Sequence, residues 1–203
     1  MKTIQEAILE EVQKINKNQD LPKDKSIIGK ISRDLQKIRG LVPKKDLNQA
    51  KLKKSFPSKK DGYLYMMEYV PPDKNKRVFF DRFPVILVLG FFGNKFLGVN
   101  LHILPLKERV LLMFFMIKNM RKTKEKYARI KINSLLSNKT ILKYILETKD
   151  TFYTTGIRSK IRPIEKEEIV ESVFLPVEKF IGMPKLKVHS MMRKRLRAND
   201  FFN

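Results

Sequence analysis

Residues 83–105 read FPVILVLGFFGNKFLGVNLHILP and form the most apolar stretch of this 203-residue chain. In residues 85–92 an extended backbone would carry apolar side chains on both faces, which is typical of a strand at the centre of a sheet. The following part alternates large aliphatic residues with small or polar ones: Leu97, Val99, Leu101 and Ile103. Such alternation predicts a strand with one buried face. Because Gly93 and Asn94 stand between the two parts and suit a tight turn, the stretch predicts a β-hairpin that nucleates the core.

The same stretch is a poor candidate for a membrane span. A bilayer requires about 18 to 20 consecutive apolar residues. Glycine and polar residues interrupt this stretch at Gly90, Gly93, Asn94, Lys95, Asn100 and His102. The N-terminus, MKTIQEAILEEVQK, also lacks the uninterrupted apolar stretch of a signal peptide. We therefore expect no membrane partner.

Composition describes a protein that folds and is strongly basic. Hydrophobic residues make up 42% of the chain and include 14 Phe, which is too apolar for a disordered polymer. The chain has 44 Lys and Arg against 21 Asp and Glu, for a formal net charge of +23, which indicates an anionic partner. Because there is no Cys, neither a disulfide nor a thiolate metal site can form.

The excess charge is unevenly distributed along the chain. Residues 1–60 contain 16 basic and 7 acidic residues, residues 107–131 contain 9 and 2, and residues 181–203 contain 6 and 1. The segments between them are close to neutral. We therefore expect N-terminal helices and a basic arm over residues 1–60, a core domain over 61–180, and a basic C-terminal helix over 181–203.

Hydrophobic periodicity predicts the elements around the hairpin. Apolar residues at helical spacing predict two amphipathic helices in the first forty residues. GYLYMMEYV, residues 62–70, predicts a strand, and the PPDKNK after it predicts a turn. Helices are expected over residues 106–132 and 135–146, and one or two strands near 157–164 and 170–175.

The basic tail also has helical periodicity. Val188, Met192 and Leu196 are expected to pack against the core, and Lys187, Lys194 and Arg197 to face outward. Together these elements predict an α+β fold. Its sheet would be small and mainly antiparallel, open or curled into a barrel, with flanking and inserted α-helices.

The sequence lacks the common signatures of catalysis. There is no GxxxxGK[ST], GxGxxG, HExxH or GxSxG motif. His102 follows Asn100 on the polar face of a predicted strand, where a hydrogen-bonded structural role is expected, and His189 is expected to be solvated or next to phosphate. The acids near the sheet are interpreted as turn and edge residues, and the acidic run 165–168 as a solvated loop. We expect no enzyme, no cofactor and no metal.

Basic segments that flank a neutral core are typical of nucleic-acid binding, because each phosphate that a cation neutralises releases a condensed counterion. The residues predicted to contact phosphate are Lys44, Lys45, Lys51, Lys53, Lys54, Lys59 and Lys60 in the arm, Arg121, Lys122 and Lys124 at the end of the mid-chain helix, and Arg193, Lys194, Arg195 and Arg197 in the C-terminal helix. Two simpler interpretations stay open. The arm can be a solvated linker, and the bases after the mid-chain helix can complement its dipole.

Four motifs carry a resemblance to a known family. They are GYLYMMEYVPPDKNK, FFDRFPVILVLG, FLGVNLHILPLKERVLLM and VFLPVEKF. In this order they resemble the DNA end protector proteins of T-even-type tailed phages. The match is most telling at Phe96, Leu97, Gly98, Asn100, His102 and Pro105, followed by Arg109. The resemblance covers residues 62–188.

This resemblance implies a virion protein that is loaded onto the end of packaged linear DNA. Such a protein blocks host exonuclease after injection and supports head completion and tail joining. Its expected partners are the phosphate backbone and linear ends of DNA, together with other virion proteins. Its expected location is the phage particle, and the host cytoplasm during assembly.

Three other functions stay open at this stage. The chain can be a structural neck, tail or baseplate component that contacts mainly other virion proteins. It can also be an RNA-binding protein of the ribosomal kind, which the composition permits and the quoted motifs do not favour. The third is a nuclease, the one enzyme-class reading, for which the carboxylate spacing matches no two-metal pattern.

Overall fold

The predicted hairpin is the centre of the fold. The computed structural model describes residues 53, 55–174 and 178–198. In it, β3 (Val85–Phe92) and β4 (Lys95–Asn100) pair antiparallel across a two-residue turn. Gly93 adopts a φ of 58° in that turn, a conformation that residues with a Cβ rarely take. The hairpin and its turn are confirmed, whereas the two helices predicted for the first forty residues lie outside the described residues.

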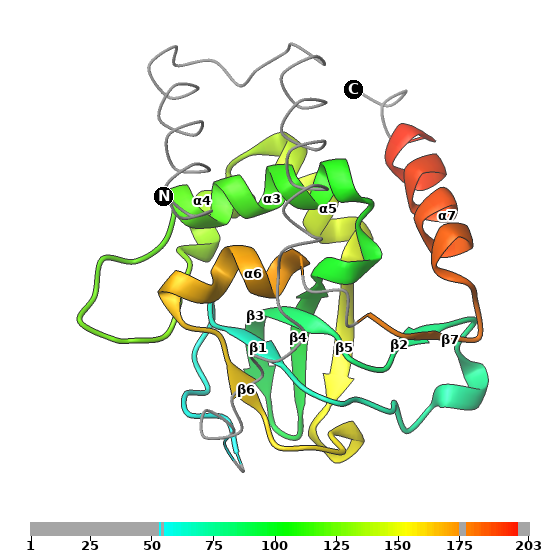
Figure 1. The fold of residues 1–203 in the computed structure, drawn as a ribbon, viewed down its shortest axis with the longest axis horizontal. Helices are drawn as coiled ribbons and strands as arrows, with labels where there is room; N and C mark the ends of the chain where they lie inside the picture. Colours follow the sequence, from blue (N-terminus) through cyan, green and yellow to red (C-terminus); the bar gives the residue numbers. More distant parts are fainter. Residues whose placement is uncertain (1–52, 54, 175–177, 199–203) are drawn as a thin grey trace, which may run out of the picture. The chain divides into compact units, whose positions relative to one another are not determined.

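Five strands form an open sheet in the order β5-β4-β3-β1-β6, and each neighbouring pair is antiparallel. The remaining strands are β1 (Leu64–Met66), β5 (Lys149–Tyr153) and β6 (Arg162–Pro163), and a separate pair consists of β2 (Phe80–Asp81) and β7 (Phe180–Ile181). Figure 1 shows this arrangement. The predicted α+β class with a mainly antiparallel sheet is confirmed. The sheet does not close into a barrel, and β5 was not predicted.

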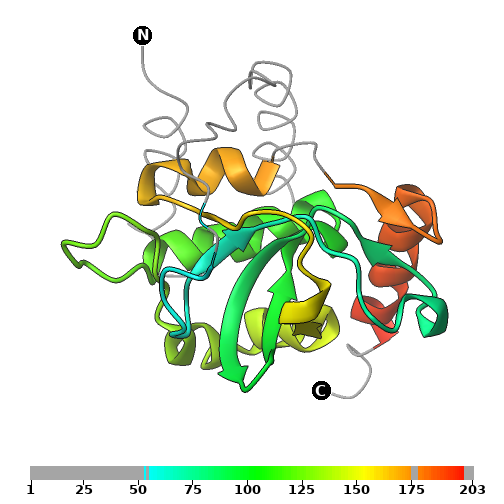
Figure 2. The same ribbon diagram turned by 90° about the horizontal axis from the view of Figure 1, so that it is seen from below.

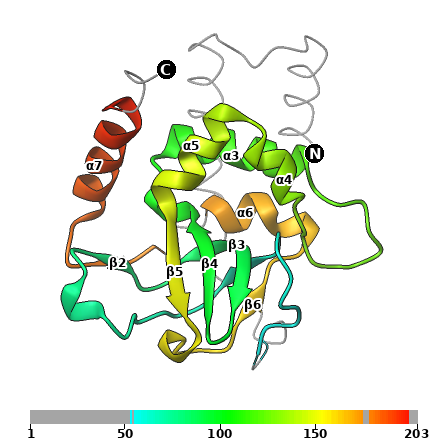
Figure 3. The same cartoon turned by 180° about the vertical axis from the view of Figure 1, so that it is seen from behind.

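Helices cover one face of the sheet. They are α3 (Leu106–Lys118), α4 (Ile132–Leu136), α5 (Lys139–Thr148) and α6 (Ile169–Phe174), and α7 (Lys185–Ala198) stands beside them (Figures 1 and 3). Single 3₁₀ turns lie at η2 (Lys74–Lys76), η3 (Leu101–Ile103), η4 (Thr154–Gly156) and η5 (Lys166–Glu168). Of the helices in the described part of the chain, none has both the length and the apolar character that a membrane span needs.

An aromatic cluster covers the other face of the sheet. Its largest members are Tyr63, Tyr65, Tyr69, Phe96 and Phe152, and Ile86 and Val88 of β3 belong to the same cluster. Because side chains alternate along a strand, Val85 and Leu87 point to the helical side, and both are fully buried. The first half of β3, residues 85–88, is therefore buried on both faces, as its apolar run predicted, whereas its end is not, since Phe92 is 66% exposed.

The second hairpin strand ends earlier than predicted. The side chain of Asn100 accepts a hydrogen bond of 3.1 Å from the backbone N–H of His102 and caps the 3₁₀ turn η3. The prediction of one exposed face was also wrong, because Gly98, Asn100 and His102 are all buried. Gly98 is required by packing, since a Cβ there would collide with the side chain of Ile86.

The strand predicted near residues 170–175 is instead helix α6. The acidic run before it, interpreted from sequence as a solvated loop, begins this helical segment. The side chain of Glu165 accepts from the backbone of the turn, and that of Glu168 accepts from the backbone N–H of Glu165, 3.2 Å away. Such a capping box satisfies backbone donors that the start of a helix leaves free.

The helix predicted over residues 135–146 is two helices. Asn138 separates α4 from α5, and its side chain accepts a hydrogen bond of 3.0 Å from the backbone N–H of Ile141. Asparagine is a favoured N-cap residue. The chain therefore starts a new helix at this point, and α5 then leads directly into β5.

Candidate nucleic-acid interface

The described end of the basic arm is attached to the sheet. The predicted residues Lys44, Lys45, Lys51 and Lys54 lie outside the described residues. The backbone of Lys53 exchanges two hydrogen bonds of 2.7 Å with Ile161, and Phe56 packs edge-on against the aromatic cluster. Lys53, Lys59 and Lys60 are exposed. This end of the arm therefore has an anchored backbone from which cationic side chains project.

The mid-chain basic residues lie in a loop and not on a helix. Helix α3 ends at Lys118, where Asn119 donates from its backbone and from its side chain to a carbonyl of the last turn. The chain then doubles back, with Arg121 N–H donating to the carbonyl of Arg129 at 2.7 Å and Lys131 N–H to that of Asn119 at 2.9 Å. These bonds use the backbone groups that a continued helix would need, so the helix predicted for this segment was wrong beyond α3.

This loop presents two free lysines. Lys122 and Lys124 are exposed and form no ion pair with any residue that the structure describes. Arg121 is half-buried, and its Nε has no hydrogen-bond partner in the described part of the chain. Lys126 is bound to Glu165 at 3.0 Å. Lys122 and Lys124 are therefore the cations of the loop that are most available to a ligand.

Two tyrosines at strand β1 connect the described end of the arm with the loop that follows α3. The hydroxyl of Tyr63 donates to Glu125 in the loop, and the hydroxyl of Tyr65 donates to the carbonyl of Ser58 in the arm at 2.8 Å. We define the loop surface as Lys59, Lys60, Lys122 and Lys124. Figures 1 and 2 place this loop and helix α7 at opposite ends of the described unit, so those predicted basic residues that the structure describes do not form one patch.

Helix α7 forms the second basic surface. Its buried side contains Val188, Met192 and Leu196, and its exposed side contains Lys187, Lys194 and Arg197, as the sequence predicted. We define the helix surface as Arg193, Lys194, Arg195 and Arg197, all of which are exposed. None of these four forms an ion pair with a described residue, and so the positive charge of α7 faces solvent.

His189, expected to be solvated, is instead 8% exposed and holds α7 to the core. Its Nε2–H donates to the backbone carbonyl of His102 at 3.0 Å. Burial lowers the pKa of His189 to about 4, because a charged imidazolium would lose its hydration there. The side chain is therefore neutral near pH 7 and is not a phosphate ligand.

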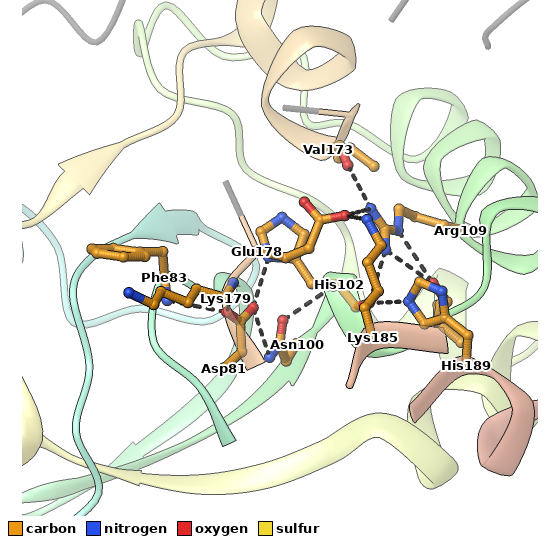
Figure 4. A network of polar contacts seen from close by, with 11 residues as sticks. Asp81, Phe83, Asn100, His102, Arg109, Val173, Glu178, Lys179, Lys185 and His189 are labelled. Carbon is orange, nitrogen blue, oxygen red and sulfur yellow. Dashed lines mark hydrogen bonds and ion pairs between the residues drawn. The ribbon is translucent and has the colours of Figure 1, made fainter. Parts of the chain in front are cut away.

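His102 and Asp81 form a fully buried pair, shown in Figure 4. His102 Nδ1–H donates to Asp81 at 2.7 Å, and the other carboxylate oxygen accepts from the backbone N–H groups of Lys179 at 3.0 Å and Phe83 at 3.1 Å. Burial would raise the pKa of Asp81, but these hydrogen bonds outweigh it and hold the pKa below its ordinary value. Burial lowers the pKa of His102. The pair is therefore a carboxylate and a neutral imidazole in a structural role, as predicted for His102.

Arg109 extends this network to the helices. Its guanidinium donates to the carbonyls of His102 at 2.8 Å, Leu104 at 3.1 Å and Val173 at 3.4 Å, and lies 4.0 Å from Glu178 (Figure 4). Three of the most telling positions of the family resemblance, Asn100, His102 and Arg109, thus belong to one buried network. This network joins the hairpin to α3, α6 and α7. Sequence reasoning missed Asp81, Glu178 and Lys185 as members of this network.

Comparison with known proteins identifies one family. Neither a curated protein nor a solved structure matches the chain. The model of one family, described as the phage T4 terminal DNA protecting protein, matches residues 37–194. Because this match spans well over half of the 203 residues, the chain belongs to the family of the phage T4 terminal DNA protecting protein.

Proposed function

We propose that this protein binds linear DNA near its end and protects that end from exonucleases. The family match over residues 37–194 carries this proposal, because the family is described by terminal DNA protection. The contacts are made mainly with phosphates, through the loop surface and the helix surface. Such contacts position a protein on DNA without reading its base sequence.

The distribution of free charge supports DNA as the ligand. The formal net charge is +23, and the exposed cations of both surfaces form no ion pair with a described residue. Each cation of this kind is free to neutralise one phosphate and release its counterion. By contrast, two arginines beside the central sheet are bound to acids: Arg82 pairs with Glu68 at 2.6 Å, and Arg129 pairs with Asp61 at 3.1 Å.

Protection in this proposal is by binding and not by catalysis. Within residues 53, 55–174 and 178–198, no three His, Asp or Glu side chains gather as they would around a metal ion. The Asp81–His102 pair is fully buried, so that no substrate can reach the imidazole. In this proposal the bound protein acts as a steric block, which keeps an exonuclease from reaching the DNA end.

The proposed setting is the phage particle, with the host cytoplasm as the place of assembly. Support of head completion and contact with other virion proteins complete the proposed role. Three exposed aliphatic residues support a protein partner: Val78 is 71% exposed, Ile181 is 37% exposed and Leu186 is 83% exposed. They lie at the β2–β7 pair and at the start of α7, where an apolar partner surface could cover them.

The test is protection of linear duplex by the purified full-length chain near physiological salt. We expect the protein to shield the duplex from a processive exonuclease, and not to shorten it when Mg²⁺ is present without the exonuclease. Competition then separates end binding from general coating. At matched base-pair concentration, shorter linear fragments should compete better, because they offer more ends, and closed circles should compete worst.

Equal competition by circles and short linear fragments refutes end protection and leaves general DNA binding. Failure to bind either DNA favours a structural component of the particle. Degradation that requires Mg²⁺ and co-purifies with the protein favours a nuclease.

A further inference from the structure

A cavity of about 180 Å³ lies between α7, the start of β5 and the segment that leads into β2. Phe79 and Phe80 line it and are half-buried, and Tyr69 and Phe152, which also line it, are buried at 1% and 3% exposure. A cavity of about 150 Å³ is large enough to bind benzene. This one therefore has room for a six-membered aromatic ring, and the phosphate contacts described above make no use of it.

Three cations and three acids line this cavity, and two of the cations at its mouth are free of ion pairs with described residues. Lys149 and Arg195 line it, are exposed, and form no ion pair with a residue in the described part of the chain. Arg77 also lines it and is bound to Asp150, and the remaining acid at the mouth, Glu147, has a partner of its own. Two free cations beside an aromatic cavity complement a ligand that joins an aromatic ring to an anion, and a nucleotide has this chemistry.

The polar floor of the cavity is already engaged within the fold. Asp81 accepts hydrogen bonds from Phe83, Lys179 and His102, and the side-chain oxygen of Asn100 accepts from the backbone of His102. Because Asp81 and Asn100 are also buried, neither side chain reads the edge of a base. A base in the cavity would be held by stacking, which every base allows.

We propose that this cavity binds the terminal nucleotide of a DNA strand. Its base leaves the end of the duplex and lies against Phe79 and Phe80, and its phosphate lies against Lys149 and Arg195. This inference rests on the proposed end-protecting function. It identifies the terminal nucleotide as the part of the DNA by which the protein distinguishes an end from the interior of the duplex. An interior base must break its pair and two stacks to enter, whereas an unpaired terminal base loses only one stack.

Helix α7 connects the cavity to the duplex. Arg195 belongs both to the helix surface and to the mouth of the cavity, and Met192 of the same helix lines the cavity. In Figure 3, α7 stands next to β2 and the edge strand β5, which border the cavity. The neighbouring residues Arg193, Lys194 and Arg197 can therefore contact the last phosphates of the duplex while its terminal nucleotide is held in the cavity.

The experiment compares two short duplexes that differ in a one-nucleotide overhang. In one duplex the overhanging nucleotide carries a base, and in the other it is abasic. Because the overhang has no partner strand, no base pair has to break in either duplex before the terminal nucleotide enters the cavity. Dissociation constants are measured with the full-length chain near physiological salt. The ratio of the abasic to the normal dissociation constant is expected to be about five or more, because the stacking of one base on aromatic side chains contributes at least about that factor.

Two variants of α7 provide a matched comparison. Arg195→Glu and Arg197→Glu change the charge of the same helix equally, but only residue 195 lines the cavity. Both are expected to weaken binding of each duplex. Arg197→Glu should keep the wild-type ratio, and Arg195→Glu should reduce it to about twofold or less. Phe79→Ala should reduce it in the same way, provided that its melting temperature shows that it folds.

A ratio below about two in the wild type, or equal ratios in the two α7 variants, overturns the inference. If linear DNA still outcompetes circles in that case, end protection survives and only the cavity assignment fails. If linear DNA and circles compete equally, the proposed function fails, and the cavity assignment fails with it.

Discussion

Replacing Arg109 by methionine tests whether the family motif around it is structural. Arg109 is 4% exposed, and methionine keeps much of its length while removing every donor. The change deprives the buried carbonyls of Leu104 and Val173 of their donor and removes one cation from beside Glu178. Each buried acceptor without a partner costs about 1 to 3 kcal/mol, and two are affected here, whereas Glu178 keeps its ion pair with Lys185.

We therefore expect Arg109→Met to lower the free energy of unfolding by about 2 to 6 kcal/mol. For a chain of this size, each kcal/mol corresponds to about 2 to 4 °C in Tm, so a decrease of about 4 to 24 °C is expected. The assay is thermal unfolding of the full-length chain followed by circular dichroism. DNA affinity, measured at a temperature where the variant is folded, should stay within about twofold because Arg109 is buried.

Arg197→Met is the matched control, since Arg197 is exposed on α7. It should change stability by less than about 0.5 kcal/mol while it weakens DNA binding. The reasoning is refuted if Arg109→Met melts within about 2 °C of the wild type. It is equally refuted if folded Arg109→Met loses DNA affinity as Arg197→Met does, because Arg109 would then contact DNA.

Three further predictions follow from the same contacts. Replacing both Lys122 and Lys124 by Gln should reduce the slope of log affinity against log salt by about 1.8, at about 0.9 per phosphate contact, and an unchanged slope would remove the loop surface from the interface. Gly98→Ala places a methyl group against the side chain of Ile86 on the neighbouring strand and should destabilise the protein by about 1 to 3 kcal/mol, and a urea midpoint equal to that of the wild type would refute this close packing. Because burial lowers the pKa of His189 to about 4 from 6.5, its neutral form contributes stability above about pH 6.5 that is lost as the pH falls to about 4. Urea midpoints from pH 7 to pH 4 should fall less steeply in His189→Gln, and an equal fall in both proteins would show that His189 does not carry this dependence.

Local patterns predicted the elements whose residues interact mainly with their sequence neighbours. The hairpin followed from a continuous apolar run and a Gly-Asn turn, and the structure pairs Phe92 with Lys95 across that turn. The packed side of α7 followed from the spacing of Val188, Met192 and Leu196. Such patterns are reliable because a strand or a helix presents its side chains at a constant period, whatever the rest of the chain does.

Sequence reasoning failed where a distant partner or a cap decided the outcome. Helix α6 was predicted as a strand because its capping box lies in an acidic run that resembles a loop. Likewise, the segment after Lys118 is helical by composition, but its backbone pairs with residues ten positions further along. In both cases the competing hydrogen bonds outweigh local propensity, which is a weak preference of less than about 1 kcal/mol per residue.

The sequence by itself determined the hairpin core, the basic character of the protein, and the family motif. Only the tertiary structure determined which of these residues are buried together and which face solvent. It places the carboxylate of Asp81 beside His102 and beside the backbone of Lys179, 98 positions away, so residues that read as polar edge positions form a buried network. It also separates the free cations into two surfaces and brings Arg195 to an aromatic cavity. The physical reason is that burial and charge pairing depend on which segments pack together, and no single segment contains that information.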